Sequence, residues 1–428
     1  MLTASCVLNS RGRRTASFQW QRPIAAALSV VVAITMTACS SGGGHTASTT
    51  SRAASAPTTR SITTTAPATS SSTAPCLSVS AIDRWPVARR AAQLIVLPSL
   101  DFNVNELAPL IRAGAGGVVF LGSATTPPDL RSRLTAAAAS SDLAAVPLVM
   151  ADVEGGGVQR LKGAVEAFPW PRQLAATRSP SQVEQLATTV GREMAGVGAT
   201  VDLAPVLDLD DRAGPSATNP DGMRSFSIDP ATASTYGIAF MRGLRAAGVL
   251  AVAKHFPGIG GSTHNTDYGP AATRPYAELQ RAGLRPFVDA IAAGVPAIMV
   301  SNAYTPGLSA EPASVSPAVI NGLLRNRLGF HGLVVTDSLS AGAITQAGYS
   351  VPHAAAAAVE AGADLALFGS TLTPADTAML NPANVTATRQ AILDALTGAV
   401  TSGHLTQARL DQAVSHVLAA KGVSVCGR

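Results

Sequence analysis

Acidic, basic and amide side chains follow several short apolar segments of the sequence. These side chains are Asp152, Glu154, Asp208, Lys254, His255, Ser301, Asn302 and Asp337. Carboxylates with Arg, Lys and His near them suit sugar binding and the cleavage of a glycosidic bond. In that reaction one carboxylate attacks or stabilises the anomeric carbon, and a second group protonates the leaving oxygen.

Other chemistries have weaker support in the sequence. There is no His-x-x-x-His or Cys-x-x-Cys spacing and the seven histidines are scattered, so no metal site is indicated. A serine nucleophile would be expected in a Gly-x-Ser-x-Gly turn, which is also missing. The glycine-rich residues 114–117 precede an apolar segment, whereas a dinucleotide-binding turn would follow one.

The elements that must position these groups alternate along the chain. Strand-like apolar runs occupy residues 93–97, 117–121, 148–151, 200–203, 249–253, 297–300, 333–336 and 365–368. Between them lie stretches with helical spacing, including residues 182–195, 275–293, 317–327 and 353–361. Eight buried strands separated by helices predict an α/β fold with a single (β/α)8 TIM-type barrel, and a doubly wound open sheet is the alternative. The polar side chains listed above would then share one face, at the carboxyl ends of the strands.

Composition and charge limit the class of protein. Hydrophobic residues make up 47% of the 428 residues and charged residues 13%, which allows a large core and excludes a mainly disordered chain. The net charge of +5 arises almost entirely before residue 39, where four arginines and no acid occur. From residue 39 onward, 27 basic residues face 26 acidic ones, so we expect no nucleic-acid partner.

The N-terminal 75 residues indicate export. An arginine-bearing start is followed by an apolar stretch, residues 24–36, that is short for a membrane span. The segment 36–39 is similar to a bacterial lipobox, which predicts a signal peptide over 1–38 and acylation of Cys39; an ordinary cleaved signal peptide is the alternative. Residues 39–75 are rich in Ser, Thr, Ala and Pro and predict a flexible linker. We therefore expect a domain over 76–428, lipid-anchored on the outer face of the cytoplasmic membrane or secreted.

Two cysteines lie at opposite ends of this domain. Cys76 and Cys426 remain once Cys6 is assigned to the signal peptide and Cys39 to the lipid. In an exported protein a disulfide between them is expected if the domain ends meet, and two unpaired cysteines are the alternative.

Five segments of the chain resemble glycoside hydrolase family 3, in its β-N-acetylglucosaminidase (β-hexosaminidase) branch, which acts on cell-wall fragments. They are residues 152–161, 203–208, 224–226, 254–258 and 312–344, in order along the chain. The resemblance implies a (β/α)8 barrel, a carbohydrate substrate and no metal or organic cofactor. It also implies retention of configuration through a covalent glycosyl-enzyme intermediate.

The resemblance assigns roles to individual residues. Asp337, in the sequence Val-Thr-Asp-Ser-Leu, matches the position of the family's nucleophile. The positions that hydrogen-bond the sugar are matched by Asp152, Arg160, Arg224, Lys254 and His255.

The general acid/base motif departs from the family pattern. Where the branch has Asp-Ser-His, this chain has Asn265-Thr266-Asp267, so the Asp–His pair is missing. Three interpretations follow: Asp267 acts as the acid/base, His264 moves into place, or the group is absent and the barrel mainly binds sugar. Nearby, Ser338 replaces the second aspartate of the nucleophile motif, and Asn302 replaces a histidine often found after the sixth strand.

These observations predict an enzyme that releases terminal β-linked N-acetylglucosamine from peptidoglycan-derived fragments or related glycans. The alternatives are a catalytically impaired sugar-binding lipoprotein and a family 3 β-glycosidase of another sugar specificity. We expect a monomer.

Overall fold

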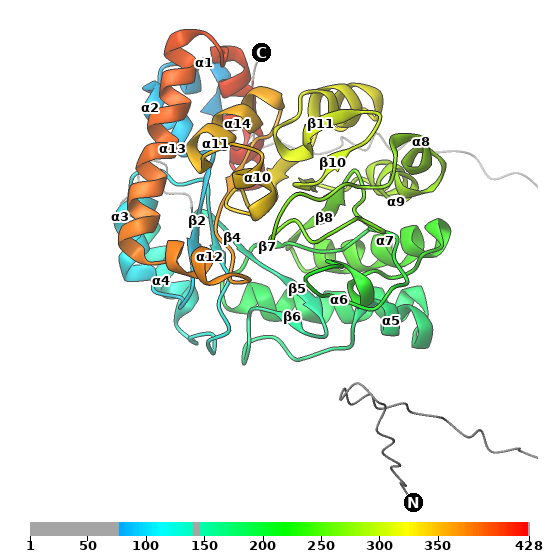
Figure 1. Ribbon diagram of the computed structural model, residues 1–428. Coiled ribbons are helices and arrows are strands. Elements are labelled where there is room, and N and C mark those ends of the chain that lie inside the picture. The colour runs from blue at the N-terminus through cyan, green and yellow to red at the C-terminus, as the bar shows by residue number, and fades with distance from the viewer. Residues whose placement is uncertain (1–76, 140–145, 427–428) are drawn as a thin grey trace, which may run out of the picture. The chain divides into compact units, whose positions relative to one another are not determined.

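The computed structural model describes residues 77–139 and 146–426, and within them a parallel barrel is the central feature (Figure 1). Its strands are β2 (Ile95–Ser99), β3 (Gly117–Phe120), β4 (Leu148–Ala151), β7 (Val201–Asp202), β8 (Leu250–Phe256), β9 (Ala297–Val300), β12 (Leu333–Thr336) and β13 (Ala366–Leu367). They pair in chain order, and every pair is parallel. A parallel bridge between Val335 and Leu365 joins β12 to β13 and closes the ring. The predicted barrel is confirmed, and the open sheet is wrong.

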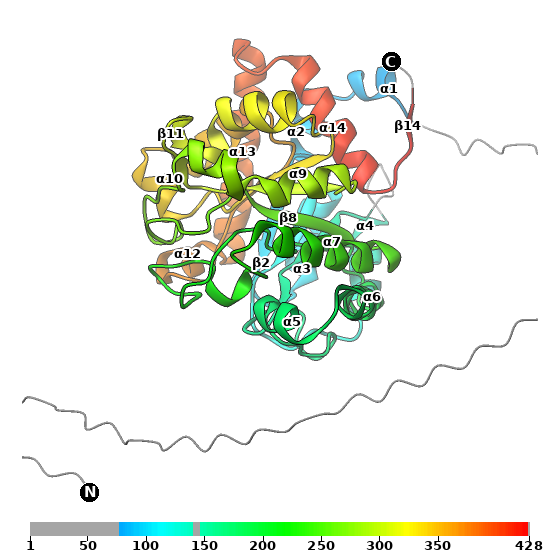
Figure 2. The same cartoon turned by 90° about the vertical axis from the view of Figure 1, so that its right-hand side faces the viewer.

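Helices surround this barrel, as the two views in Figures 1 and 2 show. The longer helices are α3 (Val104–Arg112), α4 (Leu130–Ala138), α6 (Pro180–Gly196), α7 (Pro230–Ala246), α9 (Arg285–Ala292), α11 (Val351–Ala361), α13 (Pro382–Ser402) and α14 (Gln407–Ala420). Shorter helices are α1 (Val79–Asp83), α2 (Val87–Ala92), α5 (Pro171–Thr177), α8 (Tyr276–Glu278), α10 (Gly342–Gln346) and α12 (Pro374–Met379). The stretch expected as one helix over 275–293 is divided, because a π-helical turn, η2 (Leu279–Gly283), separates α8 from α9. The stretch expected over 317–327 is a π-helix, η4 (Ala318–Arg327).

Local sequence explains where the long helices begin. Ser179 caps α6 by accepting a hydrogen bond from the Gln182 backbone N–H, while the Gln182 side chain accepts one from Ser179 in return. Asp229 caps α7 by accepting hydrogen bonds from the N–H and the hydroxyl of Thr232, and both α6 and α7 have proline at their first position. Such caps satisfy N–H groups that the helix itself leaves unpaired.

The barrel is buried on both faces of its strands. Every residue of β2, β3, β4, β9 and β12 is buried, as expected for parallel strands covered by helices outside and filled by side chains inside. Two hairpins project from the carboxyl ends of β4 and β9: β5 (Val153–Gly155) with β6 (Val158–Gln159), and β10 (Tyr304–Thr305) with β11 (Ser309–Pro312). The short 3₁₀ turns η1 (Gly222–Arg224) and η3 (Ala313–Val315) complete this side of the barrel.

The two ends of the described domain lie side by side. β1 (Leu77–Ser78) pairs in parallel with β14 (Val425–Cys426), which places Leu77 opposite Val425. Cys426 is disulfide-bonded. Its predicted partner Cys76 lies outside the described residues, as do Cys39, the predicted signal peptide 1–38 and the predicted linker 39–75. None of the helices in the described ranges has the length and apolar character that a membrane crossing requires.

Candidate active site

A cavity of about 200 Å³ opens among the carboxyl ends of the barrel strands. Seven of the eight side chains predicted to bind or cleave the sugar line it: Asp152, Arg160, Arg224, Lys254, His255, Asp267 and Asp337. His264, the remaining one, is exposed and is not among the described residues that line this cavity. The barrel therefore collects on one face groups that are up to 185 positions apart in the sequence.

A buried carboxylate, Glu154, organises the cations of the cavity. Lys254 Nζ lies 2.5 Å from Glu154 Oε1 and 2.6 Å from Asp152 Oδ1. Arg224 donates from Nε and Nη2 to the two oxygens of Glu154, each at 2.7 Å. Burial would raise the pKa of Glu154, but Arg224 and Lys254 outweigh that effect and hold the pKa well below its usual range. The result is a fixed array of charged donors and acceptors, a suitable surface for sugar hydroxyls.

Asp208 fixes the orientation of His255. Its Oδ2 lies 2.6 Å from His255 Nδ1 and accepts a hydrogen bond from the His255 backbone N–H at 3.0 Å, while its Oδ1 accepts one from the Ile259 N–H at 2.8 Å. Burial, with Arg224 nearby, lowers the pKa of His255 to about 3, so the imidazole is neutral. We infer that Nδ1 carries the proton, which leaves Nε2 as an acceptor 3.4 Å from Arg224 Nη2.

Asp221 lies in this same group and is fully buried. Within the described residues, Asp208, Asp221 and His255 form a set whose donor atoms lie within 4.8 Å of one another, close enough to share a cation. However, N–H groups already occupy both oxygens of Asp208, and the Arg224 guanidinium lies beside the imidazole. Asp208 thus already holds the imidazole, whereas neither carboxylate oxygen of Asp221 has a hydrogen-bond partner among the described residues. Burial, with Asp208 nearby, raises the pKa of Asp221 well above its usual range.

Asp337 follows β12 and is held by the backbone. Its N–H donates to the Val300 carbonyl at 2.9 Å, and its Oδ1 accepts from the Ser338 N–H at 2.7 Å. Asn302 donates to the Ser338 carbonyl at 2.7 Å and accepts from Ser314 Oγ at 2.6 Å. The two residues that depart from the family pattern here, Ser338 and Asn302, thus serve to position the loop that carries Asp337.

Asp267 lies in the cavity on a loop with several backbone restraints. Its N–H donates to Asn265 Oδ1 at 3.0 Å, and its carbonyl accepts from the Gly342 N–H at 3.0 Å. Burial, followed by the charge of Asp337, raises the pKa of Asp267 to about 7 against the opposing effect of Arg224. A carboxyl group with this pKa can hold a proton at neutral pH and release it to a leaving oxygen.

The sequence had flagged Glu154 and Asp208 as polar residues at strand ends without giving them roles. Glu154 stands two positions from Asp152, and Asp208 ends one of the five family-like segments. Asp221 and Ser370 were missed altogether. Asp221 follows no predicted strand, but Ser370 stands two positions after the strand-like run 365–368, so its place at a strand end was a signal that could have found it. Arg160 was predicted and lines the cavity, and its buried Nε has no hydrogen-bond partner among the described residues.

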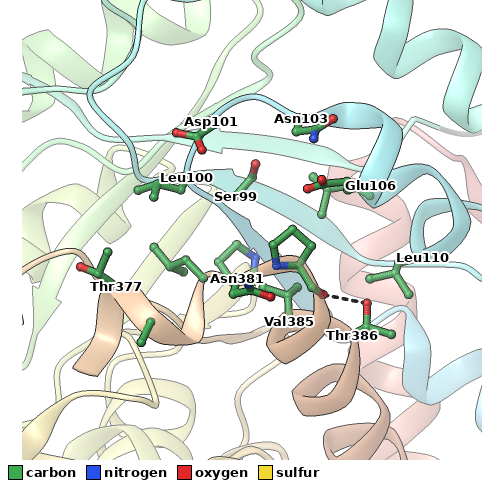
Figure 3. A pocket seen from close by; sticks show the side chains of 15 residues that line it. Ser99, Leu100, Asp101, Asn103, Glu106, Leu110, Thr377, Asn381, Val385 and Thr386 are labelled. Atoms are coloured by element: carbon green, nitrogen blue, oxygen red, sulfur yellow. Dashed lines mark hydrogen bonds between the residues drawn. The ribbon is translucent and has the colours of Figure 1, made fainter. Parts of the chain in front are cut away.

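A second cavity of about 430 Å³ lies beside the carboxyl end of β2, between α3 and α12–α13 (Figure 3). Asp101 and Glu106 are among the residues that line it, together with several leucines. Its lining contains no Lys, Arg or His, so it offers no counterpart to the paired carboxylates and cations of the smaller cavity. The arrangement capable of glycoside cleavage is therefore the one around Asp337.

Comparison with known proteins agrees with this geometry. Residues 87–420 match the Glycosyl hydrolase family 3 N terminal domain. The chain is 34% identical over 384 residues to Beta-hexosaminidase LpqI of Mycobacterium tuberculosis, spanning 84% of this chain and 92% of that protein.

Solved structures give the same result. The structure of M. tuberculosis LpqI has a TM-score of 0.71 at 32% identity, and covers 82% of this chain and 98% of that one. Beta-N-acetylhexosaminidase from Beutenbergia cavernae has a TM-score of 0.68 at 32% identity, and the match covers 79% of this chain and 99% of that one. The chain therefore belongs to glycosyl hydrolase family 3, and it is a glycoside hydrolase of the β-N-acetylglucosaminidase branch.

Proposed function

We propose that this enzyme removes terminal β-linked N-acetylglucosamine with retention of configuration, and that its substrates are peptidoglycan-derived fragments. The observation that carries the proposal is the presence of two carboxyl groups, Asp337 and Asp267, in one cavity beside a fixed set of sugar-binding groups. Two such groups, one ionised and one protonated, are what retaining cleavage requires. The hexosaminidase activity named for the relatives supports the sugar, and the cell-wall substrate rests on the resemblance alone.

In the first step a carboxylate oxygen of Asp337 attacks the anomeric carbon as the bond to the glycosidic oxygen breaks. Asp267 gives its proton to that oxygen. Esterification removes the negative charge of Asp337, which had helped to raise the pKa of Asp267, so the pKa of Asp267 falls. Asp267 then accepts a proton from water as the water attacks the anomeric carbon and releases Asp337.

The cavity favours Asp267 over the other two interpretations of the altered motif. His264 is exposed, and its carbonyl accepts a hydrogen bond from Ser262 Oγ at 3.1 Å. The following residues are anchored to α10, since Thr266 and Asp267 accept hydrogen bonds from Ala343 and Gly342. His264 would have to leave solvent to reach the substrate, whereas Asp267 already lines the cavity. A binding protein without an acid/base is also less well supported, because a protonatable carboxyl group already lies in the cavity.

The stereochemistry can be read directly by proton NMR of an aryl β-N-acetylglucosaminide during hydrolysis by the purified chain. The β-anomer of the free sugar should form first, and an initial α-anomer would contradict the glycosyl-aspartate intermediate. The substrate class is tested by comparing an N-acetylglucosaminyl-β-1,4-anhydro-N-acetylmuramic acid fragment with chitobiose under the same conditions. A higher kcat/KM for chitobiose would contradict the cell-wall assignment.

We also propose that Cys39 carries a lipid, which would hold a monomeric enzyme at the outer face of the cytoplasmic membrane. The support is the lipobox-like sequence at 36–39. A Cys39→Ala variant should leave the membrane fraction while keeping its specific activity, and sedimentation of that variant measures the oligomeric state. Retention of the variant in the membrane would contradict the anchor.

A further inference from the structure

The cavity of about 430 Å³ beside β2 is a neighbour of the active-site cavity. Gly369 lines the active-site cavity, and a Cβ there would lie 2.8 Å from Pro98 and 2.7 Å from Leu380, which both line the second cavity. Where β2 and β3 end, the Leu121 N–H of the active-site cavity donates to the Ser99 carbonyl of the second cavity at 3.0 Å. One layer of residues therefore separates the two spaces.

The α3 side of the second cavity carries two carboxylates that have no cation. Asp101 precedes α3 and Glu106 lies in its first turn, and Figure 3 shows both on the same side of the cavity. In the part of the chain that the structure describes, neither carboxylate makes an ion pair or accepts a hydrogen bond, and no Lys, Arg or His lines the cavity. A hollow lined by charge of one sign attracts a ligand of the opposite sign.

A buried hydroxyl faces the same space. Ser99, the last residue of β2, lines the cavity and is only 7% exposed, yet its side chain has no hydrogen-bond partner among the described residues. Asn103, which precedes α3, also lines the cavity, and its side chain does not cap the helix. Because buried polar groups are normally paired, these oxygens beside two carboxylates indicate a ligand with several N–H donors, as an ammonium group has.

Aliphatic side chains line much of the remaining cavity. They are Leu100, Leu107, Leu110, Leu380 and Val385. A divalent metal ion keeps water or oxygen ligands around it and would make no use of these side chains. An ammonium group on an aliphatic chain would contact both the carboxylates and the apolar wall.

We propose that this cavity binds a primary ammonium group on an aliphatic chain, carried by the peptide part of the substrate. The link to the substrate rests on the proposed function, since cell-wall fragments join N-acetylglucosamine-containing sugars to short peptides that bear amines. The terminal sugar then lies beside Asp337, and the amine lies beside Asp101 and Glu106 in the neighbouring cavity.

The binding itself is tested by calorimetric titration of the full chain with N-acetyl-Ala-Ala-Lys amide, whose single charge is the lysine ammonium. Acetylation of that ammonium should weaken binding by roughly tenfold or more, because it removes the charge that the carboxylates attract. Asp101→Asn combined with Glu106→Gln should weaken binding of the free amine to the same extent. Asp394→Asn is the matched control, because it removes an exposed aspartate of α13 that does not line the cavity.

Equal binding of the two peptides, or no binding of either, would overturn the inference. Tight binding of Ca²⁺ that the double variant loses would also overturn it, because the carboxylates would then form a metal site. Asp101 and Glu106 are both exposed, so their substitution leaves the core intact. If the double variant nevertheless fails to fold, Asp101→Asn and Glu106→Gln are titrated singly.

The link to catalysis is tested with an N-acetylglucosaminyl-anhydro-N-acetylmuramyl peptide that ends in lysine. The free amine should lower KM by roughly tenfold relative to the acetylated form, with kcat unchanged, and the double variant should abolish this difference. Its kcat/KM for an aryl β-N-acetylglucosaminide should equal that of the native chain. If both fragments are cleaved equally well by the native chain, this inference fails and the proposed function stands. If neither fragment is cleaved while the aryl glycoside is, the proposed cell-wall substrate fails, and the peptide titration still decides whether the cavity binds an amine.

Discussion

Two buried clusters, one at each end of the barrel, pair carboxylates with cations and differ in what they leave open. At the carboxyl ends of the strands, Glu154 binds Arg224 and Lys254 beside the cavity. At the opposite end, Asp364 just before β13 binds Arg325, Arg409 and His416 at 2.6–3.0 Å and also accepts from the Val334 N–H. The first cluster faces a ligand space, whereas the second joins η4 and α14 to the barrel. Similar ion pairs therefore line the ligand cavity at the carboxyl ends of the strands and stabilise the fold at the opposite end of the barrel, as expected for this fold.

The largest expected effect is on catalysis. Asp337→Asn removes the attacking carboxylate with almost no change of shape, so kcat should fall by about four orders of magnitude. The thermal midpoint should stay near that of the native chain, since Asp337 is only half-buried and keeps its backbone bonds. Steady-state kinetics and a thermal melt on the same sample check both parts. Substantial remaining turnover would show that another group attacks the sugar.

At the other end of the barrel the effect should be on stability. Asp364→Ala leaves two arginines and a histidine without their partner, which should lower the free energy of unfolding by about 3–5 kcal/mol. The kcat of the molecules that remain folded should be unchanged, because none of the hydrogen-bond partners of Asp364 among the described residues lines the cavity. Urea unfolding followed by activity below the transition separates the two quantities. A loss of kcat without a loss of stability would contradict the division between the two ends.

Removal of the acid/base should depend on the leaving group. Asp267→Ala should lower kcat by roughly 10²–10³-fold for a natural disaccharide, and much less for a dinitrophenyl glycoside that needs no proton. His264→Ala serves as the matched control and should change neither rate. Equal losses on both substrates would indicate that Asp267 maintains the shape of the cavity rather than supplying the proton.

A smaller effect on stability is expected when the pH is lowered. Burial opposes ionisation of Asp364, but the hydrogen bond from His416 and the charges of Arg325 and Arg409 lower its pKa to about 2. Because the folded pKa lies below the unfolded one, the stabilisation is complete above about pH 4 and is lost as the pH falls toward 2. Comparing native chain and Asp364→Asn by urea unfolding should show a difference that shrinks by roughly 2 kcal/mol across that range. A constant difference would contradict the pKa shift.

The two clusters also differ in how well the sequence revealed them. The cavity residues follow apolar segments and lie in family-like motifs, so Asp152, Lys254, His255 and Asp337 could be identified from the chain. Asp364 precedes a strand instead of following one, and its partners lie on η4 and α14, where a single arginine or histidine carries no signal. The position of a residue relative to a predicted strand indicates whether its side chain lies at the carboxyl end of the barrel. It does not indicate which side chains of separate helices contact each other.

The sequence by itself determined the barrel, the face on which the polar side chains gather and the family, and it predicted Asp337 as the nucleophile. It could do so because strand periodicity and strand-end residues are local features of the chain. Only the tertiary structure separates the two candidates for the missing Asp–His pair in space, since it places Asp267 in the cavity and leaves His264 in solvent. It also showed that Ser370, more than a hundred positions away in the sequence, lines the same cavity as Asp267. A proton affinity depends on burial and on charges brought close in space, and neither can be read from the order of residues.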